Sequence, residues 1–214
     1  MSTLQALIEY IGVHERALAH AVFVHIGLSG TALLIAAGLS IPLGVWTAHA
    51  RGGTPVVGVM TALRSVPSLA VLALMLPVFG LGRVPAVVAL TLLAIPPILI
   101  NTDVGYRTVE RAAVDAAVGM GMHPAQVLRR VETPLAAPVI LAGLRTAAVE
   151  VIASATLAAF IGGGGLGDLI VAGLQNDNTP ELLTGAILVA LLALAAEAGL
   201  TTARRMLSPA RAGA

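Results

Sequence analysis

The chain alternates long runs of apolar residues with short polar segments. Five apolar runs cover roughly residues 21–46, 57–79, 84–100, 137–161 and 182–200. A helix rises about 1.5 Å per residue, so about 20 apolar residues cross a hydrocarbon core of about 30 Å. The runs are continuous, whereas the strands of a membrane barrel alternate apolar and polar residues. The pattern therefore predicts an all-α membrane protein with about five transmembrane helices.

The first 20 residues differ from these runs because Glu9, His14, Glu15 and Arg16 interrupt their apolar pattern. They predict a short amphipathic lead-in rather than a sixth span. They contain no small-residue cleavage site, so a removable signal peptide is not expected. The expected organisation is a lead-in at 1–20, a transmembrane domain at 21–205 with a polar loop at 101–136, and a tail at 206–214. No internal repeat is recognisable, which disfavours transporters built from inverted repeats.

Composition supports the membrane assignment. Hydrophobic residues make up 57% of the chain and charged residues 11%, and the mean hydropathy is +0.95, far from the average soluble domain. The chain has no cysteine, which excludes disulfides and thiolate chemistry. A net charge of +1 does not indicate a nucleic-acid partner, so we expect membrane lipids and proteins as neighbours.

Arginine placement orients the spans, because cytoplasmic segments of membrane proteins carry an excess of basic residues. An odd number of spans puts the termini on opposite sides. With the C-terminus inside, the cytoplasmic arginines are Arg51, Arg107, Arg111, Arg129, Arg130, Arg204, Arg205 and Arg211, and the outer ones are Arg16 and Arg83. Arg64 and Arg145 fall within spans, near their cytoplasmic ends. We therefore expect the N-terminus outside, the C-terminus inside, and the 101–136 loop in the cytoplasm between the third and fourth spans.

The loop itself has the pattern of two short helices. Residues 106–118 are mostly good helix formers, and Gly119 and Gly121 are expected to end that helix. Pro124 suits the first turn of a second helix, and Pro134 is expected to stop it before the fourth span. The prediction is helix, tight turn, helix, lying along the membrane surface.

A motif within this loop resembles the EAA loop of ABC importer permeases. The matching residues are Asp115, Ala116, Ala117, Gly121, Val131 and Pro134, at the spacing of that loop. The chain departs from the pattern at Asp115, where Glu is usual, and at Thr133, where Leu is usual. The resemblance implies that this segment is a coupling helix that lies in a groove of a cytoplasmic ATPase subunit.

Three further segments resemble the osmoprotectant branch of this family, the permeases for glycine betaine, carnitine and choline. They are residues 64–68 (RSVPS), 95–102 (IPPILINT) and 158–167 (AAFIGGGGLG). The likeness covers about residues 20–205. It implies a type I, methionine-importer-like fold in a bacterial cytoplasmic membrane, with two permease subunits, two ATPases and an extracytoplasmic substrate-binding protein. The second permease is either a copy of this chain or a paralogue.

Two other functions stay open at this point. One is import of another small solute, such as methionine, by the same fold. The other is a passive channel or membrane scaffold, which leaves the coupling loop unexplained.

The sequence contains no convincing enzymatic motif. Gly162, Gly164 and Gly167 satisfy the spacing GxGxxG, but they follow a membrane span rather than a strand, and no Lys-Ser/Thr pair follows them. We therefore expect no catalytic residues and no cofactor in this chain, with ATP and Mg²⁺ bound by the partner ATPase. This glycine stretch is either a tight turn that allows close helix packing or a plain flexible loop.

The five histidines show no metal-ligand spacing, so no metal site is expected. Interfacial or solvent-exposed positions are predicted for them. Small residues in the first span, Gly27, Gly30, Gly38 and Gly44, suggest close packing of helices or subunits.

The fourth span is the most polar and offers a candidate translocation path. Glu150 and Ser154 are four residues apart and share a helix face. A carboxylate there would attract a quaternary ammonium cation. The alternative is that Glu150 pairs with Arg64 or Arg145 at a helix interface. Arg145 is five residues from Glu150 and does not share its helix face well, so Arg64 is the better partner. Only 3% of residues are aromatic, too few for an aromatic cage, so selection is expected to occur in a separate binding protein.

Overall fold

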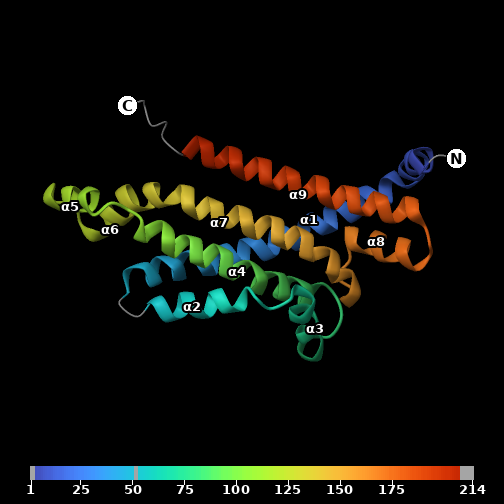
Figure 1. Ribbon diagram of the computed structural model, residues 1–214, viewed down its shortest axis with the longest axis horizontal. Coiled ribbons are helices and arrows are strands. Elements are labelled where there is room, and N and C mark those ends of the chain that lie inside the picture. The colour runs from blue at the N-terminus through green and yellow to red at the C-terminus, as the bar shows by residue number, and fades with distance from the viewer. Residues whose placement is uncertain (1–2, 51–52, 208–214) are drawn as a thin grey trace.

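The computed structural model describes residues 3–50 and 53–207 as an elongated bundle of helices (Figure 1). The long elements are α1 (Thr3–His49), α4 (Arg83–Arg107), α7 (Thr133–Ser154) and α9 (Thr179–Leu207). The shorter ones are α2 (Gly53–Leu63), α3 (Ser68–Phe79), α5 (Arg111–Gly119), α6 (Pro124–Val127), the π-turn η1 (Leu128–Glu132), the 3₁₀ turn η2 (Ala155–Ile161) and α8 (Leu166–Gln175). Four segments are long and apolar enough to cross a membrane, and a bent pair of helices makes a fifth.

Helix α1 includes the described part of the predicted lead-in. It spans 47 residues and contains one kink, at His14, where φ is −111° and ψ is 18°. The predicted lead-in is therefore helical over residues 3–20, and the kink at His14 separates its first turns from the rest of α1. Glu and Arg are good helix formers, so the charges at Glu9, Glu15 and Arg16 interrupt the apolar pattern without ending the helix.

The second predicted span is broken. Its two halves, α2 and α3, are bent by 97°. The break precedes Pro67, whose backbone is extended (φ −59°, ψ 134°), and a residue before proline is biased away from the helical region. Arg64 therefore lies at a break between two half-helices, rather than near the end of a straight span as expected.

The third span, α4, continues seven residues beyond the predicted end at residue 100. Polar side chains in this extension bond back to their own helix. Asn101 Nδ2 donates to the Pro97 carbonyl over 2.8 Å, and Thr102 Oγ1 donates to the Ile98 carbonyl over 2.8 Å. The predicted helix over 106–118 is accordingly two helices, with the junction between Arg107 and Arg111.

Pro134 does not end the second helix of the loop before the fourth span, contrary to expectation. It lies in the first turn of α7, where a missing N–H costs little. The preceding π-turn, η1, joins α6 to α7 so that the segment 124–161 is one candidate span.

Helices α1, α4 and α7 form the core, with α3 and η2 against it. Half of the buried side chains in this core are alanines, which lets backbones approach closely. Gly44 and Gly143 are required at such contacts, since a Cβ at Gly44 would lie 2.6 Å from Thr102 Cβ and one at Gly143 would lie 2.5 Å from Asn101 Cβ. Gly27, Gly30 and Gly38 face open space in this single chain, so the packing predicted for them does not occur within it.

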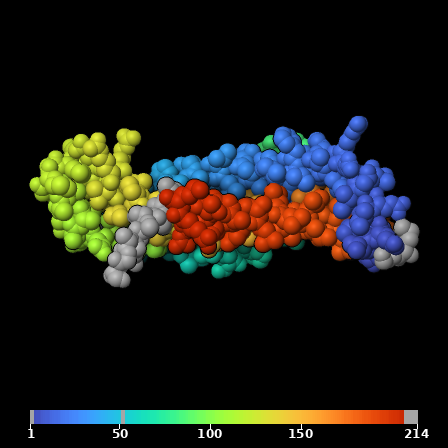
Figure 2. All heavy atoms as spheres, turned by 90° about the horizontal axis from the view of Figure 1, so that it is seen from above, coloured from blue at the N-terminus to red at the C-terminus, as the bar shows by residue number. Residues whose placement is uncertain are grey.

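The two ends of the bundle differ. Helices α5 and α6 form a tip that projects beyond the other helices at one end of the long axis, and α1 begins at the opposite end (Figures 1 and 2). The C-terminal end of α9 lies toward the tip (Figure 1). Of the expected tail at 206–214, residues 206 and 207 belong to α9. Residues 208–214, with Arg211, and Arg51 lie outside the described residues.

Candidate functional site

The tip, residues 111–132, is built on a well-defined turn after α5. The Gly121 N–H bonds to the Val118 carbonyl over 2.9 Å, and the Met122 N–H bonds to the Ala117 carbonyl over 3.1 Å. These two bonds form a Schellman motif, which needs a left-handed residue after the helix. Gly121 has φ 81°, so its predicted role in ending the helix is confirmed.

Helix α6 begins with a cap that the sequence reading missed. The Ala125 N–H bonds to His123 Nδ1 over 3.4 Å, and the His123 N–H bonds to Gln126 Oε1 over 2.9 Å. This is a capping box with histidine in place of the usual serine or threonine. The spacing His-x-x-Gln over residues 123–126, with Pro124 directly after the histidine, was the available signal.

The predicted coupling residues divide between the surface and the interior of the tip. Asp115, Ala116, Gly121 and Pro134 are exposed, and Val131 is half-buried. Ala117 is buried. A surface of small residues around Asp115 is thus available to a partner, while Ala117 is buried between α5 and the rest of the tip.

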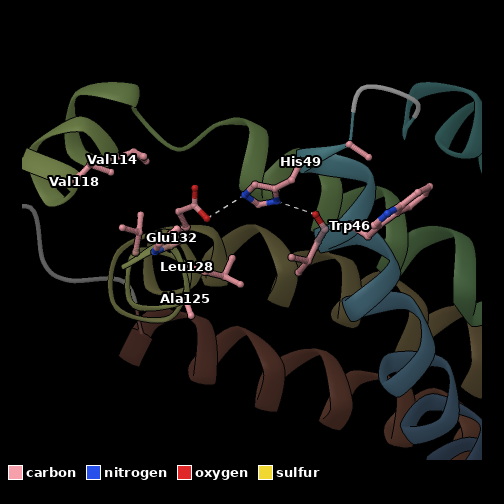
Figure 3. Close-up of a pocket in the computed structure, with 11 residues that line it drawn as sticks. Trp46, His49, Val114, Val118, Ala125, Leu128 and Glu132 are labelled. Carbon is pink, nitrogen blue, oxygen red and sulfur yellow. Dashed lines mark hydrogen bonds and ion pairs between the residues drawn. The ribbon is translucent and has the colours of Figure 1, made fainter. Parts of the chain in front are cut away.

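A groove of about 660 Å³ separates the tip from the C-terminal end of α1 (Figure 3). His49 and Glu132 bridge it, with His49 Nε2 3.1 Å from Glu132 Oε2. The other ring nitrogen, Nδ1, lies 2.8 Å from the Val45 carbonyl. Both partners accept, so the ring serves both only when each nitrogen carries a proton.

Thr133, which departs from the family pattern, has a defined role at the base of the tip. Its hydroxyl donates to the Leu128 carbonyl over 2.7 Å, across the π-turn. Tyr106 Oη lies 2.8 Å from the same hydroxyl. A threonine hydroxyl has a single proton, so Tyr106 is the donor of this second bond, which ties α4 to α7.

A second tie joins α4 to α1. Arg107 Nε donates to Asp103 Oδ2 over 2.7 Å, and Arg107 Nη2 donates to the Thr47 carbonyl over 2.7 Å. Asp103 is 4% exposed, so the guanidinium compensates a buried carboxylate and caps the end of α1. The i, i+4 spacing of Asp103 and Arg107 was the sequence signal for this pair.

The predicted path residues are only partly brought together. Arg64 and Glu150 line one pocket of about 300 Å³ between the α2–α3 break, α4 and α7. Ser154 is buried one turn further along α7 and does not line this pocket. Arg145 pairs instead with Glu197 of α9, at 3.1 Å, which excludes it as the partner of Glu150.

The glycine stretch is a tight, closely packed turn rather than a plain loop. Gly162, Gly164 and Gly165 have positive φ, and a Cβ on Gly165 would lie 3.2 Å from His25 Nδ1. His25 is fully buried and its Nε2 donates to the Ile152 carbonyl over 3.0 Å. The expectation that the histidines are interfacial or exposed is therefore wrong for His25, because a glycine turn seals it in the core.

Across residues 3–50 and 53–207, no cluster of three or more His, Cys, Asp or Glu side chains is arranged to hold a metal. The chemistry available is binding and movement. A projecting tip with a charged surface is linked by the His49, Tyr106 and Arg107 contacts to the ends of α1, α4 and α7.

The same arrangement occurs in known proteins. Residues 40–212 match the family described as "Binding-protein-dependent transport system inner membrane component". The chain belongs to this family. It is a permease subunit of an ABC importer, embedded in the inner membrane, and the fold and family resemblance predicted above are confirmed.

Relatives of the permease cover nearly its whole length. It is 40% identical over 205 residues to the choline transport system permease protein OpuBB of Bacillus subtilis, covering 95% of this chain and 94% of that one. It is 39% identical over 186 residues to the glycine betaine/carnitine/choline transport system permease protein OpuCB of the same organism, covering 86% of each.

Among solved structures, the permease resembles a chain of the inward-facing MetNI methionine ABC transporter. The TM-score is 0.79 at 21% sequence identity, over 90% of this chain and 96% of that one. At this identity the likeness shows the fold alone. A family of importer components implies ATPase and substrate-binding partners, which a passive channel or scaffold does not have.

Proposed function

We propose that the permease carries quaternary-amine osmoprotectants, such as glycine betaine, carnitine or choline, into the cell. The observation that supports this substrate class is the sequence identity to permeases named for these solutes. It is 40% and 39%, over 95% and 86% of this chain. The likeness to a methionine transporter is a fold likeness only, so methionine is the weaker candidate.

The tip is the proposed contact with the cytoplasmic ATPase, which binds ATP and Mg²⁺. Its surface presents Asp115 and Ala116, and its shape is held by the Schellman turn at Gly121. The short ties from Tyr106 and Arg107 would pass a displacement of the tip to α4, α7 and α1. We propose that the helices then move as a rigid body, which opens the transport path to one side of the membrane and then to the other, without a chemical step in this chain.

The proposed orientation has the N-terminus outside and the C-terminus in the cytoplasm. The tip and the C-terminal end of α9 lie toward the same end of the bundle, and α1 begins at the other. The exposed Arg111, Arg129 and Arg130 lie in the tip, which agrees with the excess of basic residues on cytoplasmic segments. A second permease, as a copy or a paralogue, and an outer binding protein complete the proposed importer.

Uptake of labelled glycine betaine, carnitine and choline after osmotic upshift tests this function. The host strain should lack its other osmoprotectant systems and carry the genes of the whole importer, with or without this chain. ATP-dependent uptake of at least one solute that requires this chain is expected. Absence of uptake of all three, with the complex present in the membrane, would remove the osmoprotectant assignment.

A further inference from the structure

The pocket at the α2–α3 break holds two opposite charges that do not form a close ion pair. Arg64 and Glu150 both line it. Between these two described residues no N–O distance is within 4.0 Å. A guanidinium and a carboxylate that share a cavity in this way leave room for a solute that itself carries both charges.

We propose that this pocket is a transient site for a zwitterion with a quaternary ammonium at one end and a carboxylate at the other. Arg64 receives the carboxylate, in the planar geometry that suits guanidinium, and Glu150 faces the cation. The proposal rests on the proposed function and adds the charge type of the solute. The volume of about 300 Å³ is at the lower end for small-molecule sites, as a compact solute requires.

The remaining lining suits methylated nitrogen. It is apolar and comes from α2, α3 and α4, with Met60, Leu63, Val71, Met75, Leu92 and Leu93 among its members. N-methyl groups are apolar on their outer surface and carry a spread positive charge. An apolar wall with one carboxylate therefore favours a quaternary ammonium over an inorganic cation, which needs several oxygen ligands.

Two consecutive prolines leave backbone carbonyls of α4 without their usual helical donors. Pro96 and Pro97 lie inside α4, and a proline cannot donate to the carbonyl four residues earlier. Those carbonyls belong to Leu92 and Leu93, which both line the pocket. Helix breaks that free backbone groups at a cavity are a common way for transporters to build a solute site, and here residues of a broken span and Pro96 line one pocket.

The consequence is discrimination between zwitterion and simple cation. A solute with only the ammonium group, such as choline, fills the Glu150 end and leaves Arg64 without a carboxylate. Arg64 is exposed, so solvent screens the interaction. We therefore expect a modest preference for glycine betaine over choline, roughly three- to tenfold in affinity.

Protection of an introduced thiol measures this site directly. The chain has no cysteine, so Met75→Cys places one thiol of this chain in the pocket wall. The assembled permease–ATPase complex, without binding protein, is treated with a small thiol reagent in the presence of glycine betaine or choline. Val78→Cys is the matched control, because Val78 is in the same helix, is 71% exposed and does not line the pocket.

Charge variants then assign the two ends. With Met75→Cys, glycine betaine is expected to protect at three- to tenfold lower concentration than choline, by the same estimate. Arg64→Gln should equalise the two solutes, and Glu150→Gln should weaken protection by both. Thr146→Ala, on the same helix but outside the pocket, should change neither, because the Thr146 hydroxyl bonds to the Ala142 carbonyl of its own helix. Copurification with the ATPase and an unchanged labelling rate without solute verify that each variant is folded.

Several results would overturn the site. They are protection by neither solute, equal protection by both in the unmodified pocket, or protection that survives Glu150→Gln. The uptake assay reports on the function separately. Intact osmoprotectant uptake without protection rejects only this site, whereas absent uptake rejects the proposed function itself.

Discussion

At the scale of single residues, glycine is needed at position 121 because of its backbone conformation, and not because a side chain there would clash with a neighbour. Its φ is 81°, and a Cβ there would have no neighbour within 4 Å. A left-handed conformation costs an ordinary residue about 1–2 kcal/mol, and Asn tolerates it better. We expect Gly121→Val to abolish transport and Gly121→Asn to retain most of it, measured as ATP-driven uptake in proteoliposomes.

The matched variant separates the two explanations of such a loss. If crowding were the cause, Asn, which is as bulky as Val, would be equally harmful. Loss of transport in both variants, with normal membrane insertion, would contradict the conformational account.

Thr133 and Tyr106 offer a second test at this scale. Their bond joins α4 to the π-turn at the base of the tip. A net hydrogen bond contributes about 1 kcal/mol, so Tyr106→Phe and Thr133→Val should each lower the thermal stability of the purified complex by a few degrees. Because the residues interact, the double variant should lose less than the sum of the two.

An additive loss in the double variant would show that the two residues do not act together. Thr61→Val is a suitable control, since Thr61 Oγ1 bonds only to its own helix, at the Val57 carbonyl over 2.9 Å, on an exposed face.

At the scale of elements, the Arg107 contact holds the ends of α4 and α1 together. Removing it leaves the carboxylate of Asp103 buried without a cation, which costs about 3–5 kcal/mol in a fully buried pair. The Arg107 side chain is 42% exposed, so we expect a smaller loss, about 1–3 kcal/mol, in Arg107→Met. Thermal unfolding of the complex in detergent measures it.

Adding Asp103→Asn to Arg107→Met should recover part of the loss, because the amide carries no charge to bury. A double variant less stable than Arg107→Met alone would exclude this electrostatic explanation.

Also at the element scale, the broken span and the π-turn show where sequence patterns stop being informative. The apolar run 57–79 is long enough for one span, and Pro67 alone does not say whether the helix kinks or turns by 97°. That angle depends on the surfaces of α4 and η2 against which α3 packs. Similarly, Pro134 is compatible with a stop or with a helix start, and only packing around η1 selects the start.

At the scale of the whole molecule, the orientation of the permease is testable with the same cysteine-free background. Leu4 is at the start of α1 and Met206 at the end of α9, and their side chains are 65% and 81% exposed. With the N-terminus outside, Leu4→Cys should react with a membrane-impermeant thiol reagent in spheroplasts, and Met206→Cys should react only after permeabilisation.

The reverse labelling pattern would contradict the proposed orientation and would place the tip on the outer side. Reaction of both thiols before permeabilisation would indicate leaky spheroplasts, so an internal marker protein is labelled in parallel to exclude this.

The sequence by itself determined the class of the molecule, because the apolar runs, the Arg distribution and the coupling motif are local patterns with local causes. Gly121 could be assigned to a turn for the same reason: a glycine after a helix satisfies the Schellman geometry whatever surrounds it. The candidate pair Arg64 and Glu150 was also accessible, since charges within apolar spans stand out.

Only the tertiary structure decided which distant residues meet. Arg145 pairs with Glu197, 52 residues along the chain, His25 is sealed by Gly165, and Tyr106 bonds to Thr133. These contacts depend on how α1, α4, α7 and α9 pack. Packing is decided by the total of many weak contacts, which cannot be deduced from a short sequence motif. A sequence names the side chains available to a site, while the cavity between them exists only once the helices have come together.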